Sequence, residues 1–216
     1  HEAHSSDTCL IATSFFELVD PRYTYVFQKQ LKKLRTDKID FYSLEGVCDL
    51  NKMRDIDSGA VDFLFEQREA GHIGCLGFSS ELSPDNLRDF IGRYPWDFVR
   101  MKVNYYDWFN KDGSARYDVA KEFNLPIIAH AALRTGAASA LKPEALSILK
   151  DANPDRSSVD WALRFVKSLD GIVSVTCNMH SAREVKENAS VFNDTATLSP
   201  EELDVLEACA KAQREA

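Results

Sequence analysis

The chain has 216 residues, of which 44% are apolar, and this is enough for one large domain or two small ones with a full core. Its 34 acidic residues outnumber its 26 Lys and Arg, which gives a formal net charge of −8. Such a charge does not favour binding to nucleic acid or to an anionic membrane surface. No apolar run approaches the length of a membrane span, so we expect a globular cytoplasmic protein.

The cysteines stand far apart and form no CxxC pair. They are Cys9, Cys48, Cys75, Cys177 and Cys209. A disulfide framework or a zinc site would need closer and more regular spacing, so we expect reduced thiols and no metal. The chain opens with HEAHSSDTCL, without an initiator Met or the apolar core of a signal peptide. This indicates a gene product that begins before His1.

Strand and helix patterns alternate from one end of the chain to the other. Runs rich in β-branched or aromatic residues predict strands at 9–15, 39–46, 73–80, 98–106, 126–133 and 172–179. Helical patterns follow at 25–34, 58–70, 85–94, 116–123, 157–166, 181–191 and 200–212. Apolar strands that are each followed by an amphipathic helix indicate parallel strands with right-handed crossovers. Because no linker interrupts this order, we predict one α/β domain over residues 1–216.

The strand spacing allows a barrel or an open sheet. The first and last predicted strands start five intervals apart, which gives about 33 residues per unit. Eight such units need about 260 residues, close to the size typical of a (β/α)8 barrel. The chain holds six units, which predicts a barrel without its first two. The alternative is an open doubly wound sheet, although no Gly-rich phosphate loop follows the first predicted strand.

Several sequence segments follow one another in the order in which similar segments occur in a known protein family. The strongest are LKKLRTDKIDFYSLEGV at 31–47, HIGCLGFSSELSPDNLRDF at 72–90 and MKVNYYD at 101–107. Together with segments at 126–136, 152–166 and 181–188, they resemble the aldo/keto reductase superfamily, nearest to the bacterial branch whose members often carry a C-terminal iron–sulfur extension. The resemblance covers about residues 9–214. It implies strands three to eight of a TIM (β/α)8-type barrel, an incomplete and N-terminally truncated one.

The resemblance weakens at the catalytic positions. Members of the family reduce carbonyl compounds with NAD(P)H by means of an Asp, Tyr, Lys and His tetrad, in which Tyr donates the proton. By resemblance, the Asp and Tyr precede this chain, Ser14 stands for the Lys, and Glu45 stands for the His. Some members that reduce an activated double bond carry Glu there, so a desolvated, protonated Glu45 is the candidate hydrogen-bond donor to a carbonyl. The alternative is a Glu45 that is solvated or paired with Lys or Arg.

The resemblance also implies a cofactor site. Its positions are Ser79, Ser80, Lys102, Asn104 and His130 near the nicotinamide, and Leu133, Arg134, Gly136, Ser181, Glu187 and Asn188 near the pyrophosphate and adenosine. Some have a structural interpretation: the two serines end a strand, Asn104 is a hydrogen-bonder within the fold, and His130 is a polar rim residue. Asn178 replaces a family Gly where the backbone approaches phosphate, so we expect NADP(H) binding to be weak or lost.

Two further features have two interpretations each. Arg100 and Lys102 share one side of a predicted strand, where they suit an anionic ligand or pair with neighbouring acids. An aromatic cluster follows, which lines the substrate pocket in the family or packs in the core. Its members are Tyr105, Tyr106, Trp108 and Phe109.

Two functional hypotheses follow. The first is an NADPH-dependent reductase of a small carbonyl or enone compound by descent, with impaired chemistry because the tetrad is absent. The second is a non-catalytic barrel that acts as a binding or regulatory subunit. A barrel without its first two strands exposes two sheet edges, which invites self-association. Residues before His1, a second copy or an open-barrel derivative would account for these edges, and we expect the first.

Overall fold

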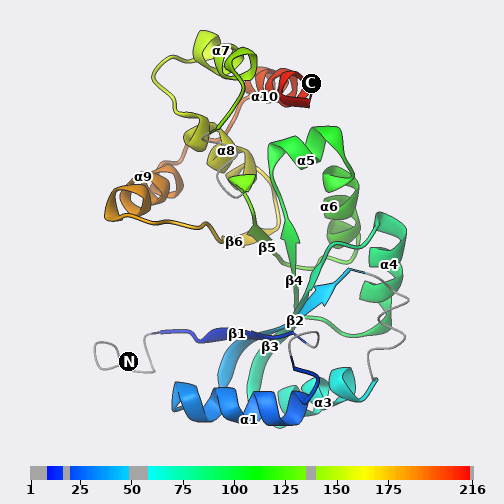
Figure 1. Ribbon diagram of the computed structural model, residues 1–216. Coiled ribbons are helices and arrows are strands. Elements are labelled where there is room, and N and C mark those ends of the chain that lie inside the picture. The colour runs from blue at the N-terminus through cyan, green and yellow to red at the C-terminus, as the bar shows by residue number, and fades with distance from the viewer. Residues whose placement is uncertain (1–8, 17–19, 49–57, 135–139, 215–216) are drawn as a thin grey trace. The chain divides into compact units, whose positions relative to one another are not determined.

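The computed structural model describes residues 9–16, 20–48, 58–134 and 140–214 (Figure 1). The chain divides into two compact units, His1–Arg100 and Met101–Ala216. The first contains β1 (Ala12–Phe15), α1 (Tyr23–Leu34), β2 (Ile39–Val47), α3 (Ser58–Glu69), β3 (Ile73–Ser80), α4 (Pro84–Arg93) and the start of β4 (Phe98–Lys102). The second contains the end of β4, α5 (Tyr105–Asn110), α6 (Gly113–Glu122), β5 (Ile127–His130), α7 (Pro143–Ala152), α8 (Ser158–Lys167), β6 (Ile172–Val175), α9 (Ala182–Asn193) and α10 (Pro200–Arg214).

The strands lie in the order β1-β2-β3-β4-β5-β6, the same as their order in the sequence. The pairs β1–β2, β2–β3 and β5–β6 are parallel, and a helix lies between the two strands of each pair. In an open doubly wound sheet the strand order reverses, whereas in a barrel it does not. The sequential order therefore confirms the predicted incomplete barrel and excludes the open-sheet alternative.

In the first unit, alternation along the strands separates an apolar face from a more polar one. Tyr42 and Phe78 are completely buried and meet the helices: Tyr42 contacts Phe27 of α1, and Phe78 contacts Phe90 of α4. Figure 1 shows α1 and α3 along this side of β1–β3. Because side chains alternate between the faces of a strand, the residues next to Tyr42 and Phe78 face the other side. That side includes Ser43 and Ser79.

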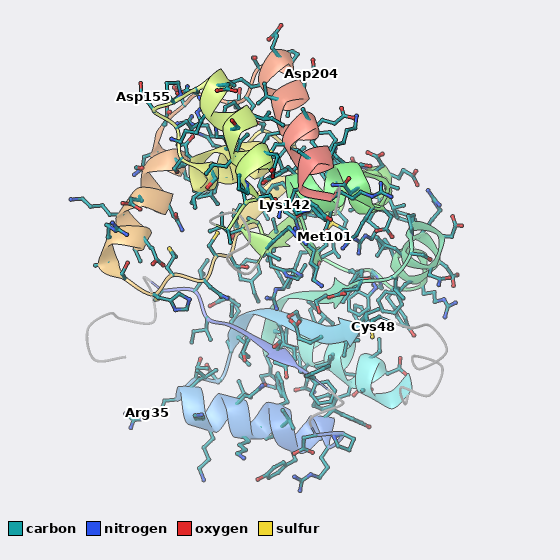
Figure 2. The ribbon with its side chains drawn as sticks, turned by 45° about the horizontal axis from the view of Figure 1, so that its top comes forward. Arg35, Cys48, Met101, Lys142, Asp155 and Asp204 are labelled. Atoms are coloured by element: carbon teal, nitrogen blue, oxygen red, sulfur yellow. The ribbon has the colours of Figure 1, made fainter. Side chains whose placement is uncertain are left out.

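The core of the second unit is built around α8. Trp161 and Phe165 of this helix are buried, and the Phe165 ring contacts aromatic rings of α5. Arg164 lies among them, with its guanidinium donating to Asp160 and Asp194 at 2.7 and 2.6 Å. Helix α10 packs against α7 and α5. Figure 2 shows α10, labelled at Asp204, beside α7.

Sequence and structure differ most after β4. The predicted strand through residue 106 ends at Lys102, because Asn104 caps a short helix, α5. Helix α7 was not predicted, although Pro143 and Glu144 in its first turn are helix-start signals. The single domain stays a prediction. No helix among the described residues is both long and apolar enough to cross a membrane.

Removing a buried ring of the first unit tests this packing. We expect Phe78→Ala to lower the free energy of unfolding by about 3–5 kcal/mol, because the cavity loses contacts with Phe90 and Trp96. Urea unfolding followed by circular dichroism measures the change. Phe123→Ala, at a 41% exposed Phe, is the matched control and should change stability by less than about 0.5 kcal/mol. Equal losses in the two variants would contradict the assignment of the core.

Candidate functional site

A β-bulge lies at the end of β2. The register with β3 shifts between Leu44, which pairs with Phe78, and Val47, which pairs with Ser80, so that Glu45 and Gly46 together stand opposite Ser79. Gly46 has a φ of 81°, and its N–H donates to Ser79 Oγ at 3.2 Å. A Cβ at residue 46 would lie 2.4 Å from a Phe16 ring carbon, so both the backbone angle and the contact favour Gly. Such bulges bend a strand locally, and this one lies just before Cys48, which is labelled in Figure 2.

The Glu45 carboxylate lies in a three-residue cluster with Ser43 and Arg100. Its Oε1 accepts hydrogen bonds from Ser43 Oγ at 2.5 Å and from an Arg100 Nη1 donor. The same Arg100 nitrogen lies 3.5 Å from Ser43 Oγ. The side chains of Arg100 and Glu45 are 30% and 22% exposed, so the pair is accessible from solvent. Ser14, which the sequence predicts at the position of the family Lys, is paired in register with Ser43 on the neighbouring strand.

This geometry matches the interpretation in which Glu45 pairs with a basic residue and Arg100 with a neighbouring acid, because each is the charged partner of the other. A carboxylate that accepts from a guanidinium is an acceptor and not a proton donor. The role of Glu45 in catalysis stays a prediction. Lys102, two residues beyond Arg100, is half-buried on β4.

The two serines at the end of β3 differ in their surroundings. Ser79 is half-buried and accepts from the Gly46 N–H across the bulge. Ser80 is buried, and its Oγ accepts from the Leu82 N–H at 3.1 Å, which closes the turn after the strand. Each hydroxyl still has its own proton to donate. By its exposure, Ser79 is the better candidate for contact with a ligand.

Asn104 is the N-cap of α5. Its Oδ1 accepts from the Asp107 N–H at 2.8 Å, and its Nδ2 donates to Asp107 Oδ2 at 3.0 Å. Burial alone would raise the pKa of the Asp107 carboxyl, but the Asn104 amide and the Lys111 ammonium, 2.9 Å away, hold it below its ordinary value. The structural interpretation of Asn104 is thus visible in its contacts, and its role toward a cofactor stays a prediction.

Three members of the aromatic cluster after β4 pack against α8, and the fourth lies under an arginine. Tyr105, Trp108 and Phe109 all contact the Phe165 ring of α8, which is the core interpretation. Burial raises the pKa of the Tyr105 phenol well above its ordinary value. Tyr106 differs, since its ring lies 3.8 Å from the guanidinium carbon of Arg134.

Arg134 and Leu133 line a small pocket in the second unit. Its other lining residues are Tyr105, Tyr106, Ala132, Leu141 and Gln213. The backbone here turns sharply, with positive φ at Ala131 and at Arg134, whose N–H donates to the Ala131 carbonyl at 2.9 Å. His130, at the end of β5, is half-buried. Gly136 lies outside the described residues.

The predicted adenosine contacts lie on α9. Ser181 caps this helix, with its Oγ accepting from the Glu184 N–H at 3.2 Å. Glu187 is 63% exposed and lies 3.7 Å from Arg183, whereas Asn188 is buried. Exposed Arg183 and the helix N-terminus suit an anionic group. Among the described contacts, none joins these residues to the pocket at Arg134.

The structure therefore gathers some of the predicted residues and not others. Glu45 and Ser79 both lie at the bulge of the first unit, where Ser79 bonds to the neighbouring Gly46, and Leu133 with Arg134 line one pocket of the second. Ser43 and Gly46 were missed; the glycine after Glu45 was the signal for the bulge. No cluster of metal-ligating side chains occurs among the described residues.

Comparison with known proteins supports one family. Residues 17–211 match the aldo/keto reductase family. Curated proteins give no match. Many solved structures do, and their low identity shows the fold alone.

Three of these structures illustrate the match. The holo form of the aldo-keto reductase AKR11C1 from Bacillus halodurans is 22% identical with a TM-score of 0.76, over 95% of this chain and 73% of its own. An aldo/keto reductase from Brucella melitensis is 18% identical with a TM-score of 0.71, over 95% and 74%. The thermostable Tm1743, solved with the inhibitor epalrestat, is 16% identical with a TM-score of 0.77, over 96% and 74%.

Substitution of Asn104 separates its two interpretations. We expect Asn104→Ala to lower the free energy of unfolding by about 1 kcal/mol, because α5 loses its cap, and Asn104→Ser to restore most of this loss. The dissociation constant for NADPH should stay within twofold in both variants. Urea unfolding and calorimetry measure the two quantities. A tenfold weaker cofactor affinity at unchanged stability would instead identify Asn104 as a cofactor residue.

Proposed function

Since the chain belongs to the aldo/keto reductase family, we propose that it is an oxidoreductase that uses NADP(H) to reduce a small carbonyl or enone compound at an altered active site. The observation that carries the proposal is the hydrogen-bonded cluster of Ser43, Glu45 and Arg100, in which Glu45 holds, by resemblance, the place of the family's catalytic His. It combines solvent access with fixed hydrogen-bond donors. Both are needed to hold a polar substrate.

The residues of this chain suit parts of a dinucleotide. Ser79, half-buried beside the bulge, offers a hydroxyl to a carboxamide, and Ser181 and Arg183 at the start of α9 suit a phosphate. Arg134, stacked on Tyr106, supplies a further cation. When bound, NADPH supplies the hydride. Because Asn178 takes the place of the family Gly after β6, we propose a weaker affinity than the family norm.

The cluster can stabilise negative charge but does not deliver a proton. Hydride addition leaves charge on the carbonyl oxygen, and a preorganised guanidinium is a strong donor to such an oxygen. Arg100 acts in this cluster as a hydrogen-bond donor, and Glu45 is engaged as its acceptor. The proton that completes the reduction therefore comes from solvent. We accordingly propose slow turnover.

The second candidate function is a barrel that binds a ligand or a partner without catalysis. The same ion pair favours it, because a Glu45 held by Arg100 does not supply the proton that the family Tyr would donate. The two candidates differ in one observable. The reductase oxidises NADPH in the presence of a carbonyl or enone compound, and the binding subunit does not.

Calorimetric titration with NADPH, followed by turnover assays on carbonyl and enone compounds, tests the proposal. We expect micromolar binding and slow NADPH oxidation. Glu45→Gln should lower kcat/KM by about tenfold or more, because Arg100 loses a charge-assisted hydrogen bond. Its NADPH affinity should not change.

Glu69→Gln, at an exposed residue of α3, is the matched control and should behave as the unmodified chain. Unchanged turnover in Glu45→Gln would remove Glu45 from the mechanism. A folded protein that does not bind millimolar NADPH would overturn the reductase and leave the binding subunit.

A further inference from the structure

We infer that the ligand taken at the cluster carries a carboxylate, and that Arg100 binds it through the edge of its guanidinium that Glu45 leaves unused. The inference rests on the proposed function where it calls this ligand the substrate. It would make Arg100 the residue that selects 2-oxo acids or unsaturated acids over their neutral analogues.

The hydrogen-bond pattern of Arg100 carries this inference. A guanidinium has five N–H donors in a planar fork. Of the three nitrogens, only Nη1 donates to described residues, with Glu45 and Ser43 as its acceptors. Nε and Nη2 form the opposite edge, whose two parallel N–H groups match the two oxygens of a carboxylate. The side chain is 30% exposed, so a small ligand can reach it.

The surroundings hold this edge in place. Glu45 fixes one end of the guanidinium, and Ser43, which is buried, donates to the same carboxylate oxygen at 2.5 Å. The bulge at Gly46, closed by Ser79, fixes the backbone beside Glu45. Arg100 is thus preorganised, and ordering a flexible side chain no longer opposes ligand binding.

The charges of the cluster favour a monoanion. Arg100 and Glu45 together are neutral, so a carboxylate brings the cluster to one negative charge. A phosphate dianion would meet the Glu45 carboxylate at close range with a single cation to offset it. The chain as a whole carries a net charge of −8, which opposes highly charged anions further. A planar, singly charged group fits these conditions best.

Binding of 2-oxobutanoate and of its methyl ester, measured by calorimetry without cofactor, tests the site. We expect the acid to bind about tenfold or more tightly than the ester, since the ester lacks the charge-assisted pair of hydrogen bonds. In Arg100→Lys the ratio of the affinity for the acid to that for the ester should fall below about threefold, because an ammonium has no bidentate edge. The matched control is Arg68→Lys, where Arg68 pairs with Asp97 at 3.0 Å and is 24% exposed; it should keep the ratio of the unmodified chain.

A second measurement uses only the unmodified chain, in case Arg100→Lys does not fold. Acetate should compete with 2-oxobutanoate, and acetamide should not. Equal binding of acid and ester, equal competition by acetate and acetamide, or an unchanged ratio in a folded Arg100→Lys would each overturn the inference. NADPH oxidation is measured separately. Selective acid binding without turnover upholds the carboxylate site and overturns the proposed reductase. Turnover with equal kcat/KM for acid and ester upholds the reductase and overturns the carboxylate site.

Discussion

A charged side chain on the inner face of a parallel sheet needs a partner of opposite charge, because its desolvation is costly. In this chain that requirement joins Arg100 of β4 to Glu45 of β2, with β3 between them. Strands lie about 4.8 Å apart, so the long Arg side chain has to cross β3 to reach the carboxylate. The residue of β3 in register with Ser43 is Gly77, where a Cβ would lie 2.4 Å from the Phe98 carbonyl oxygen. The bulge, the glycine and the ion pair therefore form one arrangement.

The second unit shows how structural and ligand-binding roles compete for the same side chains. Asn104 uses both ends of its amide on Asp107, and Ser181 uses its oxygen to cap α9. A hydroxyl that caps a helix still has a proton for a ligand, whereas an amide with both ends engaged has less capacity left. Arg134 is in a third situation: its guanidinium carbon lies 3.8 Å from the centre of the Tyr106 ring, and this cation–π contact uses its charge without using a hydrogen-bond donor. Of the predicted cofactor residues, the serines and Arg134 are thus chemically more available than Asn104.

The sequence predicts the regular parts of this fold well and the irregular parts poorly. The strand predicted at 73–80 coincides with β3, because its short apolar and aromatic run is a local signal. The strand predicted at 98–106 runs too far, since the aromatic run after Asn104 is rich in β-favouring residues while the cap begins a helix there. At the site, SLEG identifies Glu45, but nothing local indicates that Arg100, 55 residues later, is its partner. Register and bulges are properties of strand pairing, so no single segment encodes them.

By resemblance, Glu45 stands in place of a His, and its ion pair with Arg100 gives the more polar face of β2 a different chemistry. An imidazole can donate or accept near neutral pH, according to its protonation. The guanidinium of Arg100 has only donors, and the Glu45 carboxylate beside it accepts. Such a site orients anions and stabilises developing charge, but it moves no proton of its own. A reductase built on it depends on solvent for protonation, and a binding subunit needs nothing more than it already holds. Both proposed functions use the same donor edge of Arg100. The ligand that binds there therefore has to be identified before a catalytic role can be assigned.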